Sequence, residues 1–112
     1  MTEIIAEQFL AVHQSDGSWL RVKISIDRPR PVVHPTNGVS CWACYPKVDG
    51  LIDLVKPVYG SSTFVATVQA LQICRQVLRD YCKGAKFYLV KSEDSSVDKE
   101  MEVSLKILFA MA

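Results

Sequence analysis

Alternating apolar and polar positions mark the first part of the chain as β structure. From Leu20 to Ile26 every second residue is apolar, so residues 19–27 have the two-residue period of a strand with one buried and one wet side. Residues 3–13 are apolar with weaker alternation, and the turn formers QSDGS join the two runs, with Gly17 free to take a positive φ. These segments predict an antiparallel hairpin. Its solvent-facing positions are Trp19, Arg21, Lys23, Ser25 and Asp27.

The next stretch predicts a connector and a second hairpin. Residues 28–38 contain three prolines and an Asn-Gly pair. They predict an extended connector, because proline cannot donate to a strand ladder and breaks helices. Two β-rich runs, 39–48 and 51–58, then flank an Asp-Gly pair, which favours a type I′ turn between paired strands. This turn predicts a register in which Cys41 lies opposite Val58.

The hydrophobic period changes at residue 63. Residues 63–83 carry a broad apolar face at helical spacing, opposite a polar stripe of glutamines and basic residues. Ser62 supplies a hydroxyl group for the helix N-cap, and Gly84 suits the left-handed position that follows the helix. The predicted apolar face consists of Ala66, Ala70, Leu71, Ile73, Cys74, Val77, Leu78, Tyr81 and Cys82.

The remaining segments predict two more strands. Residues 86–91 form a short apolar run, and alternating apolar residues from Met101 to Phe109 favour a strand over a helix. A polar loop, SEDSSVDKE, lies between them. The order β-β-β-β-α-β-β predicts a single α+β domain over residues 1–112. In this domain an antiparallel sheet of about six strands is covered on one face by the long helix.

Composition and charge narrow the classes of partner. The chain has 112 residues, of which 49% are hydrophobic and 22% charged, as is typical of one globular core. Its formal net charge of +1 provides no overall field to hold nucleic acid or an anionic membrane. No apolar stretch is long enough for a membrane-spanning helix, and the start, MTEIIAEQFL, lacks the basic region of a signal peptide. We therefore expect a cytoplasmic protein, monomeric apart from its partner, that binds neither nucleic acid nor membrane.

No catalytic or metal-binding motif stands out. Cys41 and Cys44 have the CxxC spacing of zinc and redox sites, but in a strand they face opposite sides of the sheet, and no second ligand pair accompanies them. His13 and His34 offer acid-base groups with nothing to place them in one cleft. We expect reduced cysteines, no cofactor, no metal and no enzymatic activity. The alternatives are a small enzyme that uses His13 or His34, and a ligand-binding domain with a pocket between helix and sheet.

Charged residues gather in two segments. The basic run from Arg21 to Arg30 is interpreted as the soluble side of a strand rather than as a nucleic-acid surface. Residues 93–102 hold five acids and one lysine. Such a cluster attracts a cationic partner and imitates phosphate in a basic active site, although it could also be a loop that is only solvated. With an aromatic anchor added, the predicted partner-binding residues are Glu93, Asp94, Asp98, Glu100, Glu102 and Trp19.

One junction resembles a known kind of domain. The run Val58-Tyr59-Gly60-Ser61-Ser62-Thr63-Phe64, followed by Ala66 and Ala70-Leu71, resembles the strand-glycine-helix junction of a small uncharacterised bacterial domain family. With the preceding sheet, the likeness covers most of residues 3–90 and departs from that family at Val65, where a glutamine is expected. It implies the fold and a bacterial origin. In size and in its lack of catalytic motifs, the chain also resembles immunity proteins of bacterial contact-dependent growth inhibition.

These features together predict a non-catalytic protein-binding module. Its most specific form is a bacterial immunity protein that binds and blocks a cognate toxin, such as a basic nuclease, with an acidic surface. An interface of the usual size, about 800 Å² on each partner, fits on a domain of this length.

Overall fold

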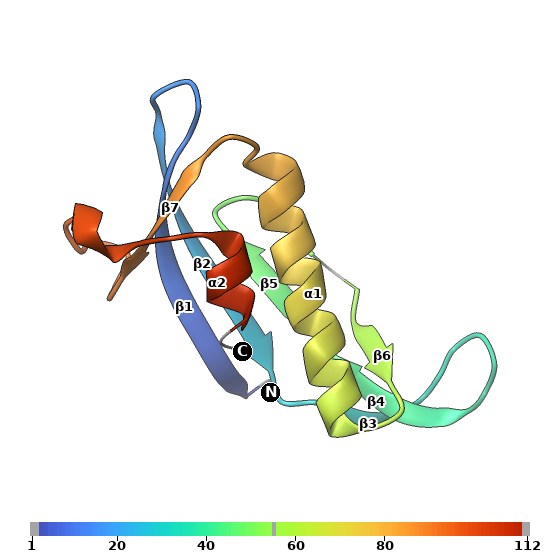
Figure 1. The fold of residues 1–112 in the computed structure, drawn as a ribbon. Helices are drawn as coiled ribbons and strands as arrows, with labels where there is room; N and C mark the ends of the chain where they lie inside the picture. The colour runs from blue at the N-terminus through green and yellow to red at the C-terminus, as the bar shows by residue number, and fades with distance from the viewer. Residues whose placement is uncertain (1–2, 55, 111–112) are drawn as a thin grey trace.

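Two antiparallel sheets and a long helix make up the structure, a computed structural model that describes residues 3–54 and 56–110 (Figure 1). One sheet has five strands in the order β5-β2-β1-β7-β8, and the other has three in the order β3-β4-β6. The predicted α+β class is confirmed, but the strands divide between two sheets. The elements are β1 (Ile4–His13), β2 (Trp19–Asp27), β3 (Arg30–Val33), β4 (Ser40–Cys44), β5 (Pro46–Asp49), β6 (Val58–Gly60), α1 (Thr63–Tyr81), β7 (Lys86–Val90), the 3-10 helix η1 (Lys99–Met101), β8 (Glu102–Val103) and α2 (Leu105–Ala110).

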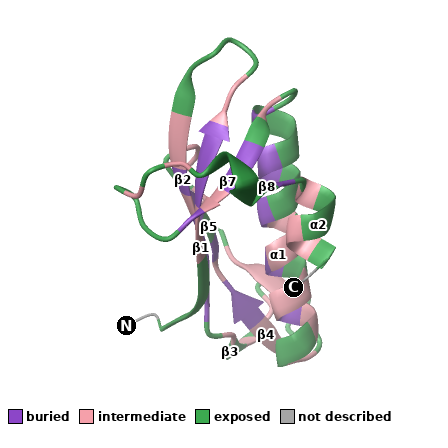
Figure 2. Ribbon diagram, turned by 60° about the vertical axis from the view of Figure 1, so that its left-hand side comes forward, coloured by how far each residue is buried: buried purple, intermediate pink, exposed green. Residues whose placement is uncertain are grey.

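The core lies between the five-stranded sheet and α1. The predicted hairpin of β1 and β2 is confirmed, and its strands pair from Ile4 opposite Asp27 to His13 opposite Trp19. Gly17 in the connecting turn has a φ of 90°, as expected. Buried residues line the sheet and the side of α1 that faces it (Figure 2). The central members of this core are Leu10, Val12, Val22, Ile24, Val48, Cys74 and Leu78.

The helix α1 begins where the sequence predicts and ends at Tyr81 rather than at residue 83. The Ser62 hydroxyl accepts a hydrogen bond from the Val65 backbone N–H (3.1 Å), so it satisfies one of the free donors of the first turn. A Cβ atom on Gly60 would lie 2.3 Å from the Ala66 nitrogen, so only glycine lets β6 approach the helix this closely. Tyr81, expected on the buried face, is 57% exposed, although Leu78 and Cys82 beside it are buried.

A single extended segment joins the two sheets. β4 lies in the small sheet and β5 in the large one, with only Tyr45 between them. The Asp27 carboxylate accepts a hydrogen bond from the Tyr45 backbone N–H (2.6 Å) and one from Arg30 (3.5 Å). The expectation that Ser25 and Asp27 face solvent is wrong, since each is only 2% exposed. Pairing with β1 and β5 on both edges of β2, together with this junction, encloses them.

The predicted hairpin across residues 39–58 has the wrong register. β4 pairs with β6 so that Cys44, not Cys41, lies opposite Val58, and β5 pairs with β2 instead. Gly50 has a φ of 95°, but no described residue other than glycine has a positive φ, so the turn is not type I′. The edge of β2 therefore decides where β5 lies. Residue 55 of the predicted second strand lies outside the described residues.

The proline-rich connector contains an edge strand. β3, within the predicted connector 28–38, pairs with β4 and has no other strand neighbour in the described small sheet. Pro31 is tolerated because an edge strand needs ladder donors on one side only. The interpretation of this segment as a connector alone is therefore wrong.

The strand predicted over residues 101–109 is wrong beyond Val103. The Ser104 hydroxyl accepts a hydrogen bond from the Ile107 backbone N–H (3.1 Å) and starts the short helix α2. Leu105 and Leu108, three residues apart on one face of α2, are partly buried against the core. The apolar spacing of this segment suits a strand and a helix alike, and packing against α1 selects the helix.

Candidate protein-binding face

A loop crosses the face of the five-stranded sheet that is turned away from α1. Ala11 alternates with the core residues of β1 and therefore points to this outer face. It forms a small buried cluster with Tyr88 and Val90, against which Phe9 and Val97 pack. Val97 belongs to the loop between β7 and β8. An apolar contact thus holds the middle of that loop on the sheet.

Arg21 fixes the same loop by a second contact. Its Nη1 donates a hydrogen bond to the Ser95 carbonyl oxygen at 2.7 Å. The hydroxyl groups of Ser92 and Ser95 are 2.8 Å apart, and the Asp98 carboxylate accepts a hydrogen bond from the Glu100 N–H at 2.9 Å, which caps η1. The loop therefore has a defined shape before any partner binds, and less entropy is lost on binding.

The predicted acidic residues are exposed and spread along this loop. None of them forms an ion pair within residues 3–54 and 56–110. Glu102 lies opposite Tyr88 in the ladder of β7 and β8. Glu93 lies over β2 and β5 on the same outer face, where it lines a cavity of about 210 Å³ with Lys23 and Asp49. The exposed acids are Glu93, Asp94, Asp98, Glu100 and Glu102.

Trp19 lies at one end of the same outer face. Its ring stacks on His13 with centroids 4.3 Å apart and planes at 11°, and it meets the Tyr88 ring at 5.6 Å. The side chain is nevertheless 44% exposed. Two ring contacts restrict its motion while leaving an apolar surface free, as suits an aromatic anchor. Through Tyr88, the structure brings Trp19 close to Glu102.

The basic run does not form a free cationic stripe. Lys23 pairs with Glu7 at 3.3 Å and Arg28 with Glu3 at 3.1 Å. Arg30 contacts the carboxylate of Asp27 at the junction of the sheets, and Arg21 contacts the carbonyl oxygen of Ser95 in the loop. Exposed pairs of this kind add little stability, but they neutralise the charge locally. The pairs of Lys23 and Arg28 agree with the interpretation of this run as the soluble side of a strand, whereas Arg21 holds the loop instead.

The histidines that suggested acid-base chemistry are not brought together. His13 ends β1 beside the β1–β2 turn, whereas His34 follows β3, where its ring meets Tyr59 at 4.5 Å. The β1–β2 turn and the β3–β4 loop lie at opposite ends of the molecule in Figure 1. Across the described part of the chain, no three His, Cys, Asp or Glu side chains converge as a metal site requires.

Burial makes three of the four free thiols poor nucleophiles. It raises the pKa of Cys44 to about 12 and that of Cys74 to about 11, because the charged thiolate is disfavoured where water is excluded. Burial raises the pKa of Cys82 as well. Cys41 is only half-buried and lies on the opposite side of β4 from Cys44.

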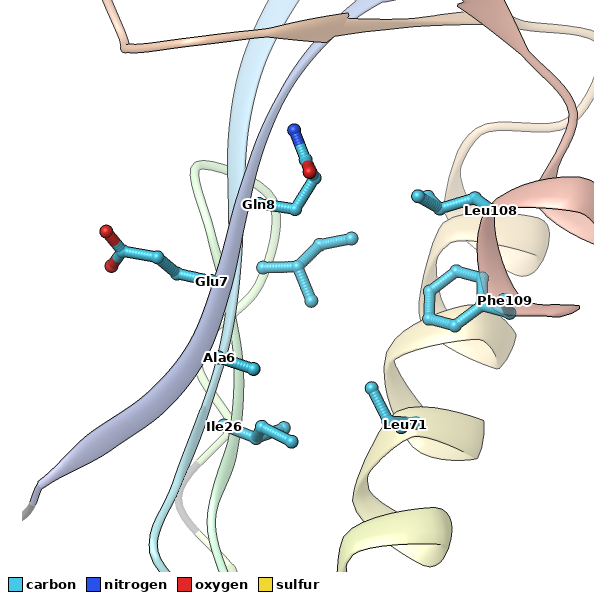
Figure 3. A pocket seen from close by; sticks show the side chains of 8 residues that line it. Ala6, Glu7, Gln8, Ile26, Leu71, Leu108 and Phe109 are labelled. Carbon is cyan, nitrogen blue, oxygen red and sulfur yellow. The ribbon is translucent and has the colours of Figure 1, made fainter. Parts of the chain in front are cut away.

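A groove lies between the helices and the five-stranded sheet. The alternative of a ligand-binding domain predicts a pocket in this place. The groove has a volume of about 220 Å³ and is mainly apolar (Figure 3). Glu7 borders it, but its carboxylate points away, whereas the Gln8 side chain projects toward Leu108 (Figure 3). The remaining wall residues are Ala6, Ile24, Ile26, Leu71 and Phe109.

Sequence reasoning missed the residues that hold the loop in place. Arg21 was grouped with the soluble basic run, although it contacts Ser95 across the sheet. Tyr88 lay in a strand whose faces could not be assigned. Val97 carried a usable signal, because it is the only apolar residue in the polar stretch 92–100.

No family model, no curated protein and no solved structure matches the chain. The likeness to a bacterial domain family and to immunity proteins therefore stays a prediction. Among the residues that the structure describes, no helix combines the length and the apolar character needed to cross a membrane.

Proposed function

We propose that this chain is a non-catalytic protein-binding module of the bacterial immunity type, whose outer sheet face binds and blocks a cationic toxin domain. The observation that carries the proposal is the acidic loop, held across the sheet by Arg21 and Val97 beside the stacked Trp19. The proposed location is the cytoplasm, where such a toxin would act.

Charge and shape give this face two separate contributions to binding. Exposed carboxylates without cationic partners speed the encounter with a basic domain and compete for groups that would otherwise hold phosphate. The exposed ring of Trp19 supplies the apolar contact on which affinity depends. A partner of ordinary size covers about 800 Å², a small part of the 7226 Å² that the described chain exposes.

Two variants with the same change in net charge test the proposal. The first removes three loop charges without changing side-chain shape, and the second adds three positive charges to the exposed side of α1, across the sheet. Asp98→Asn keeps a side-chain oxygen that can still cap η1. The substitutions are Glu93→Gln, Asp94→Asn and Asp98→Asn in the first, and Gln69→Lys, Gln72→Lys and Gln76→Lys in the second.

The immunity role predicts a toxin domain encoded in the same operon, and that domain is the partner in this test. At low salt, the loop variant is expected to associate about ten times more slowly than the wild type and to lose much of its salt dependence. The α1 variant should change much less. An equal loss of association rate in both variants would show an effect of net charge alone. An operon without a toxin domain would contradict the immunity role.

A further inference from the structure

A histidine lies directly against the exposed aromatic anchor of the outer sheet face. His13 and Trp19 pair across the ladder of β1 and β2, and their rings stack with centroids 4.3 Å apart and planes at 11°. This contact covers one face of the indole, while the Trp19 side chain stays 44% exposed. His13 is only half-buried, so protons from the solvent reach its ring. Any charge on this imidazole therefore lies in contact with the anchor.

The imidazole is the kind of group whose charge changes near neutral pH. Histidine side chains ordinarily gain a proton between about pH 8 and about pH 5. An imidazolium ring is attracted to the electron-rich face of an indole, so protonation keeps the two rings stacked. The neutral ring supports Trp19 as an apolar surface. The protonated ring supports it equally well, but adds a positive charge next to the surface that Trp19 presents to a partner.

Charges of both signs surround this ring. Lys86 faces His13 across the ladder of β1 and β7. Asp16 of the β1–β2 turn accepts hydrogen bonds from the Ser18 hydroxyl (2.6 Å) and N–H (2.9 Å). These bonds lower the pKa of Asp16, with a smaller contribution from the charge of His13. Further charged or titratable side chains on this face are Arg21 of β2, Tyr88 of β7 and Glu102 of β8.

The second histidine of the chain lies far from this face. His34 follows β3, and the β3–β4 loop and the β1–β2 turn are at opposite ends of the molecule (Figure 1). Its ring meets Tyr59 at 4.5 Å, so it is also a histidine in contact with an aromatic ring. The chain has two histidines in all. A histidine charge on the outer face is therefore that of His13, and His34 offers a matched control.

We propose that His13 is a pH-sensitive switch of the outer face, whose protonation weakens the binding of a cationic partner. This inference rests on the proposed function, because it concerns the same face and the same partner. A basic side chain in contact with the free side of Trp19 would lie about 8 Å from the imidazolium, where two positive charges repel. At low salt this repulsion corresponds to a loss of affinity of about three- to tenfold. The face therefore binds at neutral pH and releases its partner as the pH falls.

An NMR titration of the full chain tests the stacked pair without any partner. The Cε1–H signal of His13 is followed from about pH 8 to about pH 5. The ring current of Trp19 should hold this signal upfield of its position in free histidine at both ends of the titration. The indole signals of Trp19 should shift with the same midpoint as the imidazole. His13→Phe should abolish this indole shift, because phenylalanine can stack on Trp19 but cannot gain a proton, whereas His34→Phe should preserve it.

The pH dependence of partner binding provides the second test. The partner is the toxin domain of the proposed function, at low salt. From about pH 8 to about pH 5.5, the Kd of the wild type should rise about three- to tenfold, and that of His34→Phe should rise equally. His13→Phe should lose most of this rise, and what remains comes from groups on the partner. His13→Gln, which is neutral but has no ring, should lose the same pH dependence. Thermal unfolding by circular dichroism verifies that the variants are folded.

The contrary outcomes separate this inference from the proposed function. Indole signals of Trp19 that do not move as His13 titrates would overturn the switch, whatever the partner does. Equal pH dependence of binding in the wild type and His13→Phe would overturn it as well, as would tighter binding of the wild type in acid. A wild type that binds no toxin domain even at neutral pH would contradict the proposed function itself. The effect of His13 on binding would then fail with it, even if the NMR titration showed the stacked pair.

Discussion

The two halves of β1 show how differently one strand can be used. Residues 9–13 are paired on both edges, and Leu10, Ala11 and Val12 are completely buried between the core and the outer loop. Residues 4–7 are paired with β2 alone, and their side chains are exposed. Both halves have apolar, β-forming sequences. The difference arises because β7 is half the length of β1, so a neighbour covers only one half.

An open edge endangers solubility unless something limits its pairing. The ladder between β1 and β2 shifts register between Ile4 and Ala6, and a bulge of this kind twists an edge away from flat neighbours. Glu7 and Lys23 form an exposed ion pair on the same stretch. Both features oppose indiscriminate strand pairing.

The largest predicted effect is on the free energy of unfolding, when one apolar side chain in each half of β1 is truncated to alanine. Leu10→Ala, in the covered half, should lower the free energy of unfolding by about 3 kcal/mol, because the side chain is fully buried and leaves a cavity. Ile4→Ala, in the open half, should lower it by less than about 1 kcal/mol, since Ile4 is already 41% exposed. Urea unfolding of both variants measures the difference. Similar losses would mean that the open half is covered in solution.

The second prediction concerns the buried carboxylate of Asp27, a residue that lies opposite Ile4 in the ladder of β1 and β2. Asp27→Ala should lower the free energy of unfolding by about 2 kcal/mol, because it leaves the enclosed Tyr45 N–H without its acceptor. Asp53→Ala removes an exposed carboxylate from a loop and should have little effect. Denaturant unfolding of the two variants at neutral pH provides the measurement. A stable Asp27→Ala protein would show that the sheet junction holds without this hydrogen bond.

The contrast between the two halves of β1 also shows which parts of the fold can be predicted from local sequence patterns. Local signals within each segment, such as a turn, a cap or a hydrophobic period, predict the hairpin of β1 and β2, the helix α1 and the strand β7. The register of β4 and the placement of β5 depend on the edge of β2, about twenty residues away, which no local turn signal encodes. Likewise, a spacing that suits strand and helix equally becomes α2 through contact with α1.

The candidate face was predictable only in part. The exposure of the acids follows from composition, and Trp19 follows from its place on the polar side of β2. What the sequence does not reveal is that the loop folds back over the sheet, because this depends on single contacts made by Arg21 and Val97. The open edge of β1 was equally hidden. It depends on where β7 stops relative to β1, which is a property of pairing rather than of either sequence.

The third prediction sharpens the comparison on the outer face. Val97→Ala should lower the free energy of unfolding by about 1 kcal/mol and loosen the loop over the covered half of β1, because it removes part of a half-buried contact. Amide hydrogen exchange in residues 92–98 should accelerate, while exchange in α1 stays slow. Val33→Ala truncates a valine that is 64% exposed and should change neither quantity. Unchanged exchange in the Val97 variant would mean that Arg21 alone fixes the loop.

The smallest predicted effect is a pH dependence of stability that comes from the buried thiol of Cys44 in β4. Burial raises the pKa of Cys44 to about 12 from an ordinary value of 9.0, so the folded protein keeps this proton longer than the unfolded chain does. The resulting stability is complete below about pH 9 and declines as the pH rises toward 12. Lysines and tyrosines also titrate in this range, so the comparison must be between variants.

Urea unfolding between pH 8 and pH 10.5 covers the start of this decline in stability and supplies that comparison. Cys44→Ala should lose stability less steeply with pH than the wild type, because the variant lacks the buried thiol. Identical slopes in the two proteins would mean that water reaches Cys44 in solution. In that case the small sheet would be loosely packed on α1, and solvent would reach strands other than the open half of β1.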